Sequence, residues 1–204
     1  IGANPTVSHG SMATIPTFAE KLHEIVARGG RVVVVDPRRT ETAREFEWFP
    51  IAADTDAYLL LSLAHVLLAE NLVDRRRAAR QATGLGAFEA LAADFPPEST
   101  ATHTGIAAAD VRVLARDLAT KKSVLYGRLG TCLGTNPTLV NFLLDAVNFL
   151  AGNLDVAGGA VFSDSGIPLR AMLAKSGADT YDTWRSRIGS PRTQSGVWVA
   201  PSKR

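Results

Sequence analysis

The sequence predicts an α/β fold in which helices flank a parallel β-sheet. The first observation is a run of four valines, residues 32–35, which lacks polar alternation and is typical of an inner strand covered on both faces. The second is the amphipathic pattern before it, where apolar residues between Ile15 and Val26 recur at three- and four-residue steps. A helix that leads into a buried parallel strand is the second half of a βαβ unit. We therefore expect a Rossmann-like domain fragment that lacks its first strand, which would end just before Ile1.

Composition limits the classes of partner. The 204 residues contain 22 Lys and Arg against 20 Asp and Glu, so we expect no general polyanion-binding field and no nucleic-acid partner. The basic residues at 75–77 and 80 have no aromatic residues between them, which is typical of a solvated face. No apolar run is long enough to span a bilayer. The single cysteine, Cys132, excludes an internal disulfide and is consistent with a reducing compartment, so we expect a cytoplasmic location.

Two short elements follow the valine strand, which ends at Asp36–Pro37. Residues 40–45 predict a short helix, with Thr42 and Glu45 at the spacing of a capping box. The residues Glu47–Ile51, which read Glu-Trp-Phe-Pro-Ile, predict a short strand.

A long buried helix is expected next, from a loop at residues 52–56 to about Leu72. Leucine and valine surround most of its circumference, which predicts burial on every side. Asp54 or Thr55 can cap this helix. Asp56 lies in its first turn, where the helix dipole favours a carboxylate.

The rest of the chain alternates between helical patterns and glycine-containing loops. The helical patterns lie at residues 74–95 (two short helices that break near residue 84 and end at Pro96–Pro97), 111–118 and 137–150. Ser123–Tyr126 predicts a second short buried strand, which leads into the glycine-rich loop 127–134. Asn136 and Pro137 suit the start of the last helix. Residues 1–162 form the predicted domain, and residues 163–204 are polar and are expected to be a loosely structured extension.

Three loops are expected at the carboxyl ends of strands: Gly2–Pro5, Asp36–Thr40 and Gly127–Thr131. These ends share one edge of a parallel sheet, so the loops can converge on one ligand. Glycines let the backbone approach phosphate oxygens closely. Asp36 and Asp56 offer acceptors to ribose hydroxyls or to the adjacent N–H donors of guanine. An alternative is that Asp36 only turns the chain, and no loop is a P-loop or a dinucleotide fingerprint.

No catalytic residue is predicted. His9 lies in a loop without an acid or nucleophile tied to it by sequence. His23 and His65 lie within helical patterns, and His103 precedes one. Cys132 is a lone cysteine among threonine and leucine, which is usually inert packing. Because the sequence shows neither a Ser–His–Asp arrangement nor metal-ligand spacing, we predict no catalytic and no metal-binding residue in this chain.

Several short motifs follow one another at spacings that belong together. They are Ile1-Gly-Ala-Asn-Pro5, Val35-Asp-Pro-Arg-Arg-Thr-Glu-Thr-Ala43, Thr55-Asp56, Thr104-Gly-Ile106, Tyr126-Gly-Arg128, Leu150-Ala-Gly-Asn-Leu154 and Gly158-Gly159. In this order the motifs resemble the molybdopterin oxidoreductases of the dimethyl sulfoxide reductase type, which include formate dehydrogenases and nitrate reductases. The resemblance covers residues 1–162.

The resemblance implies a binding role for these loops. In the family, the corresponding central domain binds one of two molybdopterin guanine dinucleotides, which together hold molybdenum or tungsten. The turn formed by Gly2, Ala3 and Asn4 would approach the pyrophosphate. Asp36 would meet the guanosine end, and Asp56 would accept hydrogen bonds from the guanine edge. The other implied cofactor-binding residues are Arg38, Thr40, Asp54, Gly127, Arg128 and Gly130.

The sequence departs from the family at one loop. The family usually shows Pro-Gly-Thr-Asp where this chain has Ala53-Asp54-Thr55-Asp56, so an additional charge stands beside Asp56. The family's iron–sulfur segment, its metal-ligating residue and its carboxyl-terminal cofactor domain have no counterpart in this sequence. The resemblance implies that these parts, the iron–sulfur cluster included, belong to the remaining domains of a parent oxidoreductase. That parent would act on a small-molecule substrate and would be formate dehydrogenase-like, whereas this fragment alone would be inactive.

Two other interpretations stay open. In one, the chain is a free-standing nucleotide-binding module without redox activity, in which Asp36 binds a ribose. In the other, it is a family member that has lost cofactor binding and serves as a structural subunit, which the altered loop at Ala53–Asp54 favours.

Overall fold

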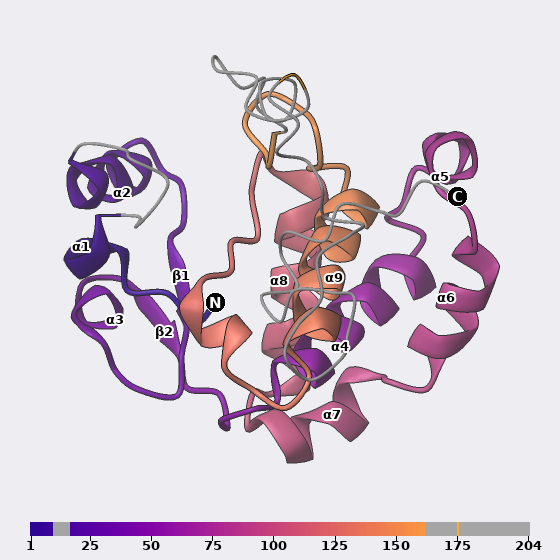
Figure 1. Cartoon of the computed structure of the whole chain (residues 1–204), viewed down its shortest axis with the longest axis horizontal. Coiled ribbons are helices and arrows are strands. Elements are labelled where there is room, and N and C mark those ends of the chain that lie inside the picture. The colour runs from indigo at the N-terminus through magenta and orange to yellow at the C-terminus, as the bar shows by residue number, and fades with distance from the viewer. Residues whose placement is uncertain (10–16, 162–174, 176–204) are drawn as a thin grey trace. The chain divides into compact units, whose positions relative to one another are not determined.

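The structure is a computed structural model that describes residues 1–9, 17–161 and 175 (Figure 1). All the elements given below belong to the unit formed by residues 1–161. The extension expected at residues 163–204 lies outside the described residues, apart from Lys175, and it stays a prediction.

A small parallel sheet confirms the α/β class. The strands β1 (Val33–Val35) and β2 (Glu47–Phe49) pair in parallel, with Val34 opposite Trp48. Val34 and Val35 are buried, as the unbroken valine run predicts. The strand expected at residues 47–51 is confirmed over its first part. In the described ranges the assigned sheet has these two strands alone.

The first residues of the chain lie beside β1. The Gly2 N–H donates to the Val35 carbonyl over 3.0 Å. The Ile1 amino group donates to the Tyr126 carbonyl over 2.7 Å. Ile1 and Gly2 therefore run between β1 and the segment around Tyr126, where a further strand of the sheet would pair (Figure 1).

The strand expected at Ser123–Tyr126 is not formed. Val124 is 50% exposed, so this segment is not buried as predicted. The Leu125 N–H donates to Asn148 Oδ1 over 2.9 Å, and the Leu125 carbonyl accepts from Asn148 Nδ2 over 2.8 Å. Asn148 belongs to α9 (Pro137–Leu150). Its amide supplies the donor and acceptor that a neighbouring strand would, so the prediction of a strand was wrong.

Three short helices belong to the part of the chain that contains the sheet. They are α1 (Pro5–Ser8), α2 (Phe18–Ala27) and α3 (Glu41–Glu45) (Figure 1). The helix expected before the valine strand is confirmed by α2 over the residues that are described. None of the residues of α2 is fully buried, so its apolar face is only partly covered.

Thr40, rather than Thr42, caps α3. The Thr40 Oγ1 accepts a hydrogen bond from the Ala43 N–H over 3.1 Å. Thr42 is buried and its hydroxyl bonds to other loops, while Glu45 lies 2.9 Å from the His23 ring nitrogen. The predicted capping box was therefore wrong, because both of its side chains have long-range partners.

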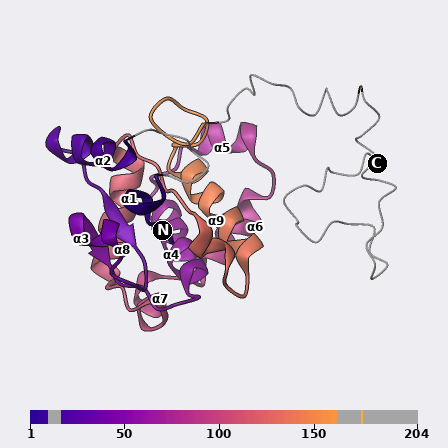
Figure 2. The same cartoon turned by 60° about the vertical axis from the view of Figure 1, so that its left-hand side comes forward.

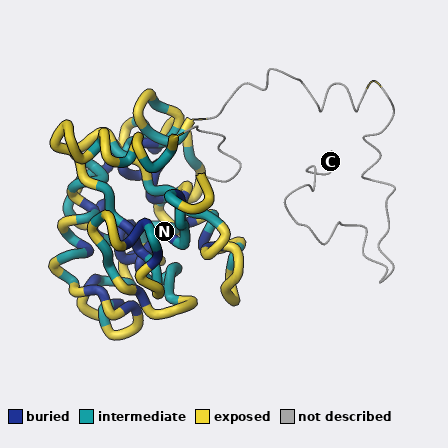
Figure 3. The backbone as a smooth tube through the Cα atoms, turned by 90° about the vertical axis from the view of Figure 1, so that its left-hand side faces the viewer, coloured by how far each residue is buried: buried dark blue, intermediate teal, exposed yellow. Residues whose placement is uncertain are grey.

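The central helix of this unit is α4 (Asp56–Ala69). It packs against α6 (Leu85–Ala93), α7 (Pro97–Thr104), α8 (Ala108–Thr120) and α9 (Figures 1 and 2). Leu60 and Leu67 have no exposed surface, and burying such a side chain stabilises the fold by about 1.5–3 kcal/mol. Figure 3 shows the buried positions inside the unit and the exposed ones along its outer turns. The expected buried helix is confirmed.

The predicted pair of short helices is confirmed by α5 (Arg75–Gln81) and α6. The helix α7 begins where Pro96–Pro97 predicts an end, because proline at the first helical position lacks only an N–H that would be unpaired anyway. His103 lies inside α7, and its ring stacks on that of Tyr58 with 4.5 Å between centroids. None of the described helices has both the length and the apolarity to cross a membrane.

Candidate functional site

Three carboxylates lie near one another where β1 ends and α4 begins. Asp36 directly follows β1, and Asp54 and Asp56 flank the start of α4. Burial raises the pKa of Asp56, and the charges of Asp54 and Asp36 raise it further. Charge interactions weaken with distance and are screened by salt. The effect of Asp54 and Asp36 on the pKa of Asp56 therefore indicates that these carboxylates are neighbours. The structure thus places Asp36 and Asp56 near enough for their charges to interact, while what they bind stays a prediction.

The Asp36 carboxylate is partly used by its own loop. Its Oδ1 accepts a hydrogen bond from the Arg38 N–H over 2.9 Å, which is the geometry of the turn interpretation. Within the described ranges no hydrogen bond reaches its other oxygen, which stays available to a ligand. Arg38 is exposed and pairs with Glu41 at 3.7 Å. Thr40 is buried and already caps α3.

Asn4 is turned toward α3. Its Nδ2 donates to Glu41 Oε2 over 2.7 Å, and its Oδ1 accepts from the Thr42 hydroxyl over 2.8 Å. The Thr42 hydroxyl in turn accepts from the Thr6 N–H over 3.1 Å. Ala3, beside Asn4, is half-buried. Thr42 is therefore a positioning residue that sequence reasoning missed. The sequence does show a threonine two residues after the N-cap Thr40, but the capping-box prediction assigned it to the cap itself.

Two glycines of the candidate site pack against each other. A Cβ on Gly130 would lie 2.6 Å from the Gly2 Cα, and one on Gly2 would lie 2.9 Å from the Gly130 Cα. The Gly130 N–H donates to the Gly2 carbonyl over 3.0 Å. Gly127 faces the core, since its Cβ would lie 2.3 Å from Leu144 Cδ1. Packing within the protein explains these glycines, and the cofactor contact implied for them stays a prediction.

The Arg128 side chain carries a buried donor without an acceptor. Its Nε has no hydrogen-bond partner among the residues that the structure describes. The Arg128 N–H donates to the Ile1 carbonyl over 3.3 Å. The next residue, Gly2, donates its N–H to the carbonyl of Val35, which directly precedes Asp36, over 3.0 Å. Arg128 therefore lies in the same neighbourhood as the carboxylates, and its unsatisfied donor suits an anionic oxygen.

Asp54 takes up a left-handed backbone conformation, with φ at +63°. Its carboxylate accepts a hydrogen bond from the Thr135 N–H over 2.8 Å and a second one from the Thr135 hydroxyl. These two bonds lower the pKa of Asp54. Neither Asp54 nor Thr55 caps α4 through its side chain, because the Thr55 hydroxyl donates to the Ala52 carbonyl instead. Thr55 therefore holds the predicted N-cap position of α4, but without a capping hydrogen bond from its side chain.

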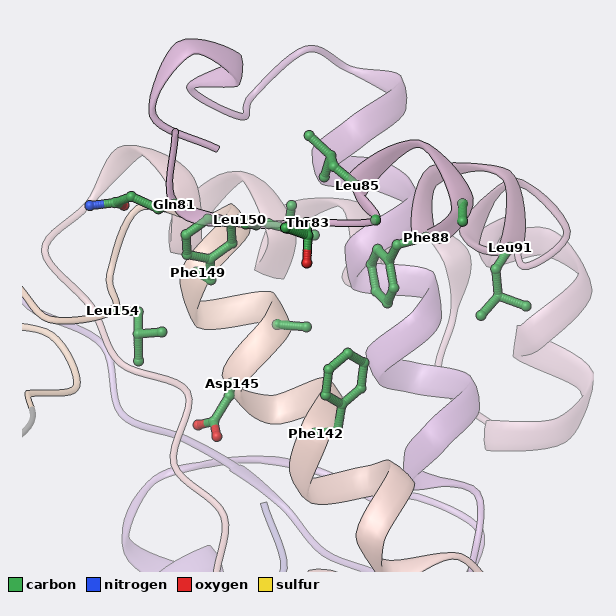
Figure 4. Close-up of a pocket in the computed structure, with 14 residues that line it drawn as sticks. Gln81, Thr83, Leu85, Phe88, Leu91, Phe142, Asp145, Phe149, Leu150 and Leu154 are labelled. Atoms are coloured by element: carbon green, nitrogen blue, oxygen red, sulfur yellow. The ribbon is translucent and has the colours of Figure 1, made fainter. Parts of the chain in front are cut away.

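A groove of about 560 Å³ lies elsewhere, between α6 and α9 (Figure 4). Phe88 and Phe142 face each other across it, with 6.2 Å between ring centroids. Its lining is mostly apolar, with Asp145 as the acidic exception. No predicted site residue lines this groove, so it is separate from the carboxylates at the end of β1.

The histidines and the cysteine are not gathered into a centre. His65 bonds to the Ala92 carbonyl over 3.0 Å, and His9 ends α1. Cys132 is exposed beside Asn141. Within residues 1–9, 17–161 and 175, no three His, Cys, Asp or Glu side chains are grouped so that they could hold a metal ion.

The chain that carries these loops matches a known class of proteins. Residues 1–174 match the family model of the molybdopterin oxidoreductases, so the chain belongs to the molybdopterin oxidoreductase family. The family that the motifs resemble is thereby confirmed.

The individual relatives are enzymes named for different reactions. The trimethylamine-N-oxide reductase of Haemophilus influenzae is 26% identical over 99% of this chain and 28% of its own length. Formate dehydrogenase H of Escherichia coli is 31% identical over 62% of this chain and 17% of its own length. The structure of acetylene hydratase from Pelobacter acetylenicus matches with a TM-score of 0.63 and 25% identity, over 70% of this chain and 20% of that one. The chain thus spans less than a third of the length of each of these relatives.

Proposed function

We propose that this chain is the Rossmann-like central segment of a molybdopterin-dependent oxidoreductase, and that it holds the guanine dinucleotide end of the cofactor. The cofactor, with molybdenum or tungsten, supplies two-electron redox chemistry when it is bound. This chain's residues bind and orient the nucleotide end. The proposal is supported by two observations: Asp36 and Asp56 lie near enough for their charges to interact, and the Arg128 Nε–H has no acceptor among the described residues.

The donors and acceptors present fit such a group. In the described part of the chain, no other residue donates a hydrogen bond to the Asp56 carboxyl, so it keeps acceptor positions for the adjacent N–H donors of guanine. The second oxygen of Asp36 can accept from a ribose hydroxyl. Arg128 and the turn at Gly2–Asn4 would face the pyrophosphate, whose oxygens are acceptors for guanidinium and backbone N–H groups.

The other residues implied for the site position its loops or add charge beside Asp36. Thr40 and Asn4 fix the loops through α3. Arg38 is exposed beside Asp36 and can add a positive charge there. We expect Gly127 and Gly130 to act by letting the loops pack closely.

The parent enzyme is part of the proposal. Since the chain spans 17% of formate dehydrogenase H at 31% identity, we propose a formate dehydrogenase-like parent whose remaining domains are the partners of this segment. Those domains would hold the iron–sulfur cluster and the substrate, in the cytoplasm. A free-standing nucleotide-binding module is the alternative, favoured by the second oxygen of Asp36, which no hydrogen bond reaches among the described residues.

Calorimetry with GDP, GMP, ATP and NAD tests the proposal on this chain. We expect GDP to bind best and the Asp56→Asn variant to lose that preference, because the amide replaces an acceptor by a donor. Asp94→Asn, at the end of α6, is the matched control. A preference for adenine nucleotides would favour the free-standing module. Bound metal with turnover in this chain alone would refute the assignment as a nucleotide-holding segment.

A further inference from the structure

The segment Gly127–Asn136, which we call the strap, is held at its start, near its middle and at its end. At its start, the Arg128 and Gly130 N–H groups donate to the carbonyls of Ile1 and Gly2, over 3.3 and 3.0 Å. Near its middle, the Asn141 side-chain amide donates to the Thr131 carbonyl over 3.2 Å and lies 3.7 Å from Cys132 Sγ. At its end, the Thr135 N–H and hydroxyl both donate to the Asp54 carboxylate. Figure 1 shows the strap running from beside the first residues of the chain to the start of α9.

Burial does not hold the second half of the strap. Every residue from Cys132 to Asn136 is exposed, and Leu133 is 74% exposed. Its side-chain anchor to the loop before α4 is Asp54. Hydrogen bonds therefore decide where this half of the strap lies, since little apolar surface would be lost if it moved.

The residues around this anchor are matched to one another. A Cβ on Gly134 would lie 2.2 Å from Asp54 Oδ1, so the carboxylate fills the space that the missing side chain leaves. Asp54 has a left-handed φ of +63°, which aspartate tolerates better than most residues. A glycine at this position would permit the same φ but could not bond to Thr135, so the contact comes from the carboxylate and not from the backbone conformation.

Building on the proposed function, we infer that Asp54 is a positioning residue that clasps the strap to the start of α4 and so holds Arg128 and Gly130 in place for the nucleotide. The strap is then ordered before the ligand arrives, which lowers the entropic cost of binding.

Hydrogen exchange on the whole chain without nucleotide tests the clasp. In Asp54→Gly, which keeps the left-handed backbone and removes both bonds, we expect the Thr135 amide to exchange about tenfold faster. The Arg128 and Gly130 amides should also exchange faster. Asp155→Gly is the matched control, because Asp155 has a φ of +55° outside the strap. Unchanged exchange at Thr135, Arg128 and Gly130 in Asp54→Gly would overturn the inference.

Two further variants separate the clasp from a general loss of structure. Thr135→Ser keeps both donors and should behave as wild type, whereas Thr135→Val keeps only the backbone donor and should be intermediate. GDP affinity should fall severalfold in Asp54→Gly and recover in Asp54→Asn, which keeps an acceptor oxygen. If Asp54→Gly loosened the strap but left GDP affinity unchanged, the positioning role would be refuted. If the wild type did not bind GDP, the proposed function would fail, while exchange at Arg128 and Gly130 would still decide whether Asp54 holds the strap.

Discussion

Replacing Gly130 by alanine tests how closely the two loops of the candidate site pack. The added Cβ would lie 2.6 Å from the Gly2 Cα and 2.9 Å from the Gly2 carbonyl oxygen. Both atoms belong to the backbone, so neither can rotate away. Gly2 is itself fixed by the hydrogen bond from its N–H to the Val35 carbonyl. The loops must therefore move apart.

The expected loss of stability follows from two effects. Overpacking of this kind costs about 1–3 kcal/mol. Moving the loops apart also weakens the bond from the Gly130 N–H to the Gly2 carbonyl, which is worth about 0.5–1.5 kcal/mol. We therefore expect Gly130→Ala to lower the free energy of unfolding by about 2–4 kcal/mol.

Urea unfolding followed by circular dichroism measures this loss. The matched control is Gly86→Ala in α6, where an added Cβ meets nothing within 4 Å. That variant should be more stable than wild type by a few tenths to about 1 kcal/mol, because alanine is the better helix former. The packing argument would be refuted if Gly130→Ala unfolded at the same urea concentration as wild type.

Other predictions concern the core, the loop contacts and pH. Leu143→Ala should cost about 2–5 kcal/mol, since Leu143 has no exposed surface, whereas Phe142→Ala should cost far less, because Phe142 is 58% exposed; equal losses in urea unfolding would contradict this. Thr42→Val should cost about 1–3 kcal/mol by leaving Asn4 without its hydroxyl donor, and a melting temperature equal to that of wild type would argue against it. Because the pKa of Asp56 is raised in the folded chain, its ionisation opposes folding, and stability falls as pH rises through that pKa. Asp56→Asn should therefore be more stable than wild type at pH 7, with the difference gone below the unfolded pKa of about 4; a difference that persists at low pH would show another cause.

Strong periodic patterns predicted the larger elements. The apolar runs of α4 and α9 and the amphipathic face of α8 identify these helices, because a helix of three or more turns repeats its pattern often enough to be recognised. The segment Ser123–Tyr126 has the composition of a strand, but the amide of Asn148 takes the place of a neighbouring strand. A partner 23 residues away along the chain is not visible in a local pattern.

The candidate site was predictable in position but not in its contacts. That Asp36 follows β1 was predicted from the valine run, but the strand-end rule does not place Asp56, which begins α4. The contact between Gly2 and Gly130 joins residues that are distant in sequence. The sequence therefore predicted that these glycines approach a ligand, whereas in the structure each leaves the space that the other's backbone occupies. Asp54 shows the same limit, because its partner Thr135 is 81 residues away.

Mapping GDP binding by amide chemical shifts tests the central claim most directly. We expect the shifts to cluster at Gly2–Asn4, Asp36, Asp54–Asp56 and Arg128–Gly130. Shifts confined to the groove between α6 and α9, or no shifts at a GDP concentration that saturates related nucleotide sites, would contradict it.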